Sequence, residues 1–310
     1  MVTNGNVFLF LVACLIAVFS APGCAPQSAE RDHGTLAVLT SISIVEDLVR
    51  EVGGEKVEVT NLIPAGVDPH TYKPVASDLN KIEGAKVVVF IGRSLEGRLG
   101  EVLAGLDSSK VTTLPLAGVD DEDTPFDIVE DRSDPHIWMD PAVWANAADS
   151  VAKELAAADP ENASYYEENA KRYRKRLSEL TRESAIALEK IPSSRRVLIT
   201  PHDSFRYFGQ RFNIRTEGLQ GLSTATEASA ARVKELSDLI AERKIPAVFY
   251  ESTQPTNTMD ALAKAARAKG IEVKVAGPLY TDSLGPADSG ATTYLDMFRK
   301  NVQTIVQALQ

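Results

Sequence analysis

The chain has 310 residues, and 33 lysines and arginines stand against 43 aspartates and glutamates, so its formal net charge is −10. This acidic balance argues against a nucleic-acid partner, because it provides no basic surface for phosphates. Hydrophobic residues make up 44%, which is too apolar for a disordered chain. Two cysteines, Cys14 and Cys24, exclude a four-cysteine zinc site, an iron–sulfur cluster and a disulfide scaffold.

The N-terminal segment carries an unbroken apolar run of thirteen residues, Val7–Phe19. A membrane-spanning helix needs about 20 such residues, so the run predicts a secretory signal peptide over residues 1–23. Small residues precede Cys24, as in a bacterial lipobox, where the cysteine is lipidated and becomes the new N-terminus. Ala21 stands where a lipobox usually has leucine, so a secreted protein with a free thiol is the alternative. Residues 24–34 are then a lipidated cysteine and a flexible tether.

After the tether, short runs rich in valine and isoleucine alternate with stretches of helical periodicity. Strands are predicted at Thr35–Thr40, Lys56–Ile63, Lys86–Ile91, Val111–Leu116, Arg196–Thr200, Ala247–Tyr250 and Glu272–Val275. Helices are predicted at Ile42–Val52, Val75–Glu83, Ser94–Ala104, Ala142–Ala157, Ala228–Arg243 and Met259–Lys269. This alternation predicts an α/β fold of two lobes, each with a parallel-type sheet flanked by helices.

One long helix, predicted over residues 159–192, joins the lobes at residues 35–158 and 193–310. It opens with Asp159-Pro160-Glu161, in which a carboxylate caps the helix and proline takes the first turn. Apolar or small residues then recur at intervals of three and four: Tyr166, Ala170, Tyr173, Leu177, Leu180, Ser184, Leu188 and Ile191. A helix of this length, about 45 Å, is a stiff linker, so we expect a largely preformed cleft between the lobes.

Three of the four histidines, His70, His136 and His202, directly follow a proline, and His70 and His202 come soon after predicted strands. Ligands of parallel sheets bind beyond the carboxyl ends of strands, and proline stiffens the loop that presents the imidazole. Any one of them alone is more typical of a hydrogen-bonded core histidine. Three in one context, divided between both lobes, favour a shared role as metal ligands.

A carboxylate from the C-terminal lobe would complete a four-coordinate site. Asp282, which follows a predicted strand and a proline, is the first candidate, although its neighbours also suit an Asx turn or helix cap. Glu251, at the end of another strand, is the second candidate, as an outer partner or alternative ligand. Asp68 and Asp134, each two residues before a histidine, either orient the imidazoles or, as we favour, set the turns.

Several motifs together resemble a known family: a lipobox-like start, GVDPHTY at Gly66–Tyr72, DPHIWMDP at Asp134–Pro141, a histidine after a mid-chain strand, and YTDSLG at Tyr280–Gly285. From about residue 35 to the C-terminus the chain resembles the zinc and manganese substrate-binding proteins of bacterial ABC transporters, solute-binding protein family 9. The resemblance implies two α/β lobes joined by a long helix, with one metal ion in the cleft. It places the metal ligands at His70, His136, His202 and Asp282.

The resemblance also implies a place in the cell and a partner. The protein is expected to be an extracytoplasmic lipoprotein, held by lipid on Cys24 in the periplasm or on the outer face of the cell membrane. Its partner is the membrane permease of an ABC importer, which receives the metal as transported ligand. We expect a monomer without catalytic activity.

Three imidazoles and one carboxylate favour Zn²⁺ as the metal. Mn²⁺ is the alternative, because a bidentate Asp282 would raise the coordination number to five. Many zinc-specific members of the family carry a histidine-rich loop before the second ligand, whereas Asp120–Asp134 is short, acidic and free of histidine. A zinc-dependent hydrolase and a surface adhesin are alternative functions. Four protein ligands would leave no open position for catalysis, and neither His-Glu-x-x-His nor Gly-x-Ser-x-Gly occurs.

Overall fold

The structure, a computed structural model, describes residues 34–118 and 133–310. The predicted signal peptide, Cys24 and most of the acidic segment Asp120–Asp134 lie outside these residues. Thr35–Gln310 form one compact unit, so the boundaries of the lobes remain a prediction. We use "N-terminal lobe" and "C-terminal lobe" for the described residues before and after the long helix α5.

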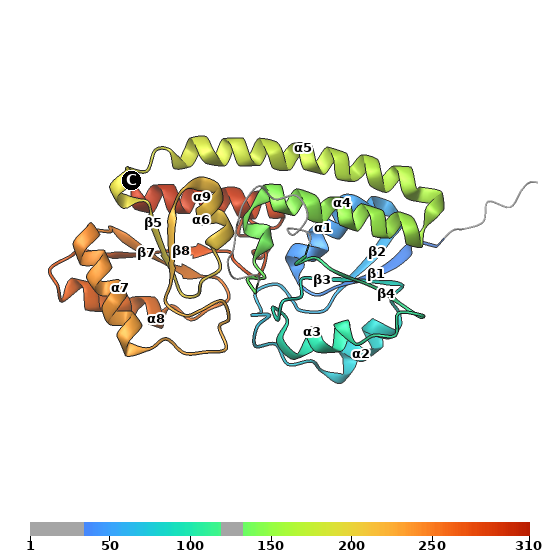
Figure 1. The fold of residues 1–310 in the computed structure, drawn as a ribbon, viewed down its shortest axis with the longest axis horizontal. Helices are drawn as coiled ribbons and strands as arrows, with labels where there is room; N and C mark the ends of the chain where they lie inside the picture. The colour runs from blue at the N-terminus through green and yellow to red at the C-terminus, as the bar shows by residue number, and fades with distance from the viewer. Residues whose placement is uncertain (1–33, 119–132) are drawn as a thin grey trace, which may run out of the picture. The chain divides into compact units, whose positions relative to one another are not determined.

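The N-terminal lobe is built on a four-stranded parallel sheet in the order β2-β1-β3-β4. Its strands are β1 (Leu36–Thr40), β2 (Val57–Asn61), β3 (Val87–Phe90) and β4 (Thr112–Pro115). Helices α1 (Ser43–Gly53) and α4 (Pro141–Ala158) cover one face, and α2 (Ala76–Glu83) and α3 (Gly97–Ala104) cover the other (Figure 1). The strand order reverses between β1 and β3, and the carboxyl ends there are where a parallel sheet binds its ligand.

The C-terminal lobe carries two parallel strand pairs, β5 (Val197–Thr200) with β6 (Arg215–Gly218), and β7 (Ala247–Glu251) with β8 (Lys274–Leu279). Strands β5 and β7 lie against each other (Figure 1). The helices are α6 (Arg206–Phe212), α7 (Ala230–Arg243), α8 (Asn257–Arg267) and α9 (Tyr294–Leu309). Strand β8 begins two residues later than predicted and runs four residues further, to Leu279.

Helix α5 (Ala163–Leu188) extends over both lobes in Figure 1 and, at 26 residues, is about 39 Å long. The predicted apolar stripe is buried at every position from Tyr166 to Ile191. The predicted start was wrong, because residues 160–162 form a short 3-10 helix and α5 begins after it. The Asp159 carboxylate caps no backbone amide; it accepts hydrogen bonds from the Asn162 side chain and the Tyr166 hydroxyl. None of the described helices is long and apolar enough to cross a membrane.

The two lobes share one apolar core, in which α9 returns from the C-terminal lobe to pack on α1 and α5. Tyr294, at the start of α9, stacks on Trp144 of α4 with ring centroids 5.7 Å apart. Its hydroxyl donates to the carbonyl of Trp138, 2.7 Å away. Trp138 and Trp144 are fully buried. The lobes are therefore joined by packing as well as by the linking helix.

Candidate metal centre

Four side chains converge in a buried space between the two lobes: His70, His136, His202 and Asp282. One ligand atom from each lies within 4.8 Å of the other three. His70 comes from the loop after β2, His136 from the loop before α4, His202 from two residues after β5, and Asp282 from three residues after β8. The structure thus brings together all four residues that the sequence singled out as ligand candidates.

His202 is held by the carboxylate of Glu251, the last residue of β7. Its Nδ1 donates to Glu251 Oε2 at 2.6 Å, and its backbone amide lies 3.4 Å from Oε1. Burial by itself lowers the pKa of His202, but the carboxylates of Glu251 and Asp282 raise it well above its usual value. Because Glu251 bonds to Nδ1 while Nε2 faces Asp282 and His136, Glu251 lies on the side of the ring that faces away from the other ligand candidates. This position fits an outer partner better than an alternative ligand.

His136 has a carboxylate of its own. Asp134 Oδ1 accepts from the His136 backbone amide at 2.9 Å and from its ring Nδ1 at 2.8 Å. Asp134 therefore both sets the turn and orients the imidazole, the two roles that the sequence left open. The Nε2 atom of His136 lies 3.3 Å from Nε2 of His202.

His70 is supported differently. Asp68 Oδ1 accepts from the His70 backbone amide at 2.9 Å, so Asp68 sets the turn as predicted. Neither ring nitrogen of His70 has a hydrogen-bond partner among the described residues, although both are buried. Burial lowers the pKa of His70 to about 4, against the attraction of the Asp282 carboxylate. A buried neutral imidazole without a partner has a lone pair available for a metal.

Asp282 turns both of its oxygens toward the histidines. Oδ2 lies 3.6 Å from His70 Nε2 and 3.3 Å from His202 Nε2, and Oδ1 lies 3.6 Å from His136 Nε2. Both oxygens are buried and have no hydrogen-bond partner among the described residues. Burial alone would raise the pKa of Asp282, but the imidazoles, His202 first, hold it below its usual range. The carboxylate is thus ionised, as a metal ligand must be.

The spacing of these atoms suits a divalent transition metal. Ligands about 2.0–2.1 Å from a tetrahedral Zn²⁺ are about 3.4 Å apart. The separations between ring nitrogens and carboxylate oxygens are 3.3–3.6 Å. The unpartnered atoms on His70 and Asp282 are those a metal ion would satisfy. The residues present therefore fit a metal ion.

The loop that carries Asp282 is fixed by both lobes. Within the C-terminal lobe, Asn301 of α9 bonds to the backbone amide and carbonyl of Tyr280. Ser283 Oγ accepts from the Gly66 amide at 2.7 Å, and the Leu284 amide donates to Ser43 Oγ at 2.9 Å. On the other side of Asp282, the Trp138 indole donates to the carbonyl of Thr281 at 2.7 Å. Asp282 is thus held in place from both lobes.

Two arginines that the sequence analysis did not single out support the loop of His136. Arg93 donates to the carbonyl of Asp134 and to the hydroxyl of Tyr207 across the cleft, both at 3.3 Å. Arg211 on α6 pairs with the buried carboxylate of Asp140, which also caps α4. A separation of 71 residues along the chain gives no local signal for this ion pair.

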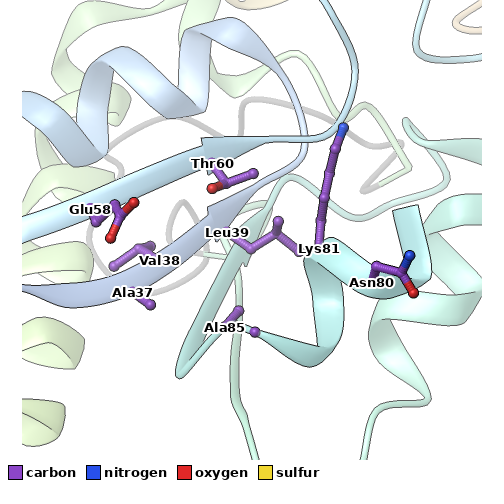
Figure 2. A pocket seen from close by; sticks show the side chains of 9 residues that line it. Ala37, Val38, Leu39, Glu58, Thr60, Asn80, Lys81 and Ala85 are labelled. Carbon is purple, nitrogen blue, oxygen red and sulfur yellow. The ribbon is translucent and has the colours of Figure 1, made fainter. Parts of the chain in front are cut away.

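A separate cavity of about 260 Å³ lies in the N-terminal lobe between α2 and strands β1 and β2 (Figure 2). Alanine, valine and leucine side chains of β1 line it together with Glu58, Thr60, Asn80 and Lys81. These four polar residues are exposed, and Lys81 is within 3.6 Å of Asp78. None of the four ligand candidates lines this cavity.

Comparison with known proteins gives one family. The sequence pattern of the family described as zinc-uptake complex component A, periplasmic, matches residues 38–308. The chain is 35% identical over 302 residues to the manganese-binding lipoprotein MntA of Bacillus subtilis, which covers 97% of this chain and 98% of MntA. It is 32% identical over 307 residues to the zinc-binding protein TroA of Treponema pallidum, covering 96% of this chain and 98% of TroA.

Solved structures agree with these relatives. The periplasmic zinc binding protein TroA from Treponema pallidum matches with a TM-score of 0.82 and 33% identity, over 89% of this chain and 99% of that one. A manganese-bound periplasmic metal binding protein from Candidatus Liberibacter asiaticus matches with a TM-score of 0.75 and 27% identity, over 89% and 100% of the chains. The fold expected from the sequence, two α/β lobes with a long linking helix, is confirmed by these likenesses.

Proposed function

The chain belongs to the family of periplasmic zinc-uptake components, the substrate-binding proteins of metal ABC transporters, and we propose on this basis that it captures a divalent transition metal outside the cytoplasm for import. Its relatives are transporter components rather than enzymes. The observation that carries the proposal is the convergence of His70, His136, His202 and Asp282 in one buried space.

Zn²⁺ is the proposed metal, with Mn²⁺ as the alternative. Three imidazole nitrogens, each 3.3–3.6 Å from an oxygen of Asp282, support Zn²⁺, which binds nitrogen ligands more strongly than Mn²⁺ does. Both oxygens of Asp282 face the site, and bidentate binding would give the higher coordination number that suits Mn²⁺. The relatives include MntA, named for manganese, and TroA, named for zinc.

The location and partner follow from the same membership. We propose a signal peptide over residues 1–23, a lipid on Cys24 that anchors the protein to a membrane, and a permease that receives the metal. The name of MntA as a lipoprotein supports the anchor. The lobes at residues 35–158 and 193–310 would each contribute ligands, as the elements that carry the four side chains indicate.

Titration of the metal-free protein tests the proposal. Zn²⁺ and Mn²⁺ are each added in competition with a chelator of known affinity, and metal content is measured by mass spectrometry on protein purified from its native host. We expect one Zn²⁺ per chain, bound more tightly than Mn²⁺. Affinity should fall between pH 7.5 and pH 5.5, because imidazoles must be unprotonated to bind.

A matched pair of variants links the binding to the site. Asp282→Ala removes the only carboxylate among the four proposed ligands and should weaken Zn²⁺ binding at least about 100-fold. Asp288→Ala removes an exposed carboxylate six residues away and should bind like the unsubstituted protein. Unchanged affinity in Asp282→Ala, or failure of the unsubstituted protein to bind either metal, would refute the proposal.

A further inference from the structure

A carboxylate beside the metal centre ties the two lobes together at the edge of the cleft. Asp68 uses Oδ1 for the turn that presents His70. Its other oxygen, Oδ2, faces the C-terminal lobe and accepts from the Thr224 hydroxyl at 2.6 Å and the Gln254 side-chain amide at 2.9 Å. These donors lie 156 and 186 residues further along the chain. One side chain thus joins the loop of a ligand candidate to two loops of the opposite lobe.

Gln254 belongs to the structure that holds His202. It lies in the turn that follows β7, and its backbone amide lies 3.3 Å from the carbonyl of Glu251. Glu251 in turn accepts from Nδ1 of His202. A displacement of Gln254 would therefore also displace Glu251, the residue whose carboxylate orients His202.

Thr224 is connected to the same ligand by a second route. The side chain of Gln220 donates to the carbonyls of Thr224 and Thr226, at 3.4 Å and 2.7 Å. The backbone amide of Gln220 donates at 2.7 Å to the carbonyl of Pro201, the residue before His202. Thr224 and Gln254, the two donors to Asp68, are thus each connected through hydrogen bonds to a residue that holds His202: Thr224 to Pro201 through Gln220, and Gln254 to Glu251.

The remaining ligand candidates are fixed differently. Asp282 is anchored through its neighbours to both lobes, at Ser43 and Gly66 on one side and at Glu251 and Asn301 on the other. His136 is oriented by Asp134 within its own loop. The supports described for His202, Glu251 and the loop of Gln220, both lie in the C-terminal lobe. Separation of the lobes at this edge would move His202 away from His70 and His136.

We propose that Asp68, Thr224 and Gln254 form a latch that keeps His202 in the metal centre and sets the rate at which the metal escapes. The latch residues contact no metal; they position His202 by holding its supporting loops against the loop of His70. Hydrogen bonds to an ionised carboxylate are the strong kind, and here both must break before the lobes separate at this edge. This inference rests on the proposed function.

The double variant Thr224→Val, Gln254→Ala tests the latch without altering Asp68 or the turn at His70. Zn²⁺ dissociation is measured by adding an excess of chelator to the loaded protein and following the released metal. We expect dissociation about tenfold faster, with the association rate within about twofold and one metal per chain. In the metal-free variant, backbone amides of residues 252–256 should exchange with deuterium faster.

Two controls separate the latch from a local effect. Thr71→Val removes a hydroxyl that lies 3.2 Å from the same oxygen of Asp68 but within its own loop, and should leave dissociation unchanged. Thr224→Ser keeps the hydroxyl and, with Gln254 intact, should dissociate at the normal rate. Equal rates in the double variant and the unsubstituted protein would overturn the latch, as would an equal acceleration in Thr71→Val. Failure of the unsubstituted protein to bind metal would refute the proposed function instead.

Discussion

The three histidines differ in the hydrogen-bond acceptor of Nδ1, the ring nitrogen on the far side from the proposed metal. Glu251 accepts from Nδ1 of His202 and Asp134 accepts from Nδ1 of His136, whereas His70 has no such acceptor among the described residues. A carboxylate at Nδ1 fixes the tautomer and leaves the Nε2 lone pair directed at the metal. His202 and His136 are therefore oriented by hydrogen bonds, and His70 by its turn and its packing.

Glu251→Gln should weaken Zn²⁺ binding about 10- to 100-fold. The amide oxygen can still accept from Nδ1, but the negative charge that makes His202 a stronger ligand is lost. Competition with a chelator measures the affinity. Glu272→Gln, at an exposed position in the same lobe, serves as the control and should bind normally. An affinity of Glu251→Gln within twofold of the unsubstituted protein would contradict the role given to this carboxylate.

The ligand candidates were visible in the sequence because proline precedes each of the three histidines. The turn-setting carboxylates were visible too, since an aspartate two residues before its partner amide is a local pattern. The hydrogen bond between His202 and Glu251 could be predicted only in part. The two residues are 49 positions apart, and the order of the strands decides whether they meet. The partners of Asp68 depend wholly on how the lobes face each other.

Helices α1 and α9 meet at a half-buried carboxylate. Asp47 of α1 accepts from the backbone amide of Tyr294, one of the unpaired amides in the first turn of α9, at 3.0 Å. Burial raises the pKa of Asp47 to about 6, and the nearby carboxylates of Glu51 and Asp296 add to the effect. The Tyr294 amide and Arg176 favour the ionised form, but burial outweighs them, so ionised Asp47 is unfavourable here.

The substitution Asp47→Asn should stabilise the metal-free protein at neutral pH. The folded state holds a proton on Asp47 up to about pH 6, whereas the unfolded state releases it near pH 3.8, so this residue lowers stability as pH rises between these values. Asparagine keeps the acceptor for Tyr294 without the charge. We expect a gain of about 1–3 kcal/mol in unfolding free energy at pH 7.5 and a smaller gain at pH 4.5. Urea denaturation measures both, and equal gains would contradict the assignment.

The elements that the sequence missed are those with the weakest local pattern. Strand β6 has the sequence Arg-Thr-Glu-Gly and only one buried residue, so no apolar run marks it. Helix α6 has seven residues, fewer than two helical turns, so its sequence is too short to show a repeating pattern of apolar residues. Helix α9 was also missed, although nine of its sixteen residues are buried, because no strand follows it to complete the alternation used for the prediction.

Across the whole molecule, the lobes are held together on the side of α4, α6 and α9. Arg211 of α6 pairs with Asp140 at the start of α4, and the Asp140 side chain is fully buried. Tyr294 of α9 stacks on Trp144 of α4 across the lobes, with ring centroids 5.7 Å apart. These contacts are separate from the hydrogen bonds of Asp68 to Thr224 and Gln254, which join the lobes at another place.

Arg211→Met should lower the unfolding free energy of the metal-free protein by about 3 kcal/mol, because it leaves the buried Asp140 carboxylate without its cation. Arg299→Met removes an exposed contact to Glu183 on α5 and should cost less than about 1 kcal/mol. Urea denaturation compares the two. Equal losses would show that Arg211 contributes no more than a surface ion pair.

The position of helix α9 in the chain determines when the core of the N-terminal lobe can form. Its residues are synthesised after those of the N-terminal lobe and α5, yet Tyr294 supplies the ring that covers Trp144 and the hydroxyl that donates to the carbonyl of Trp138. A nascent chain that has emerged only as far as the linking helix therefore still exposes two tryptophans. The core of the N-terminal lobe is therefore complete only once α9 has packed against α1 and α5.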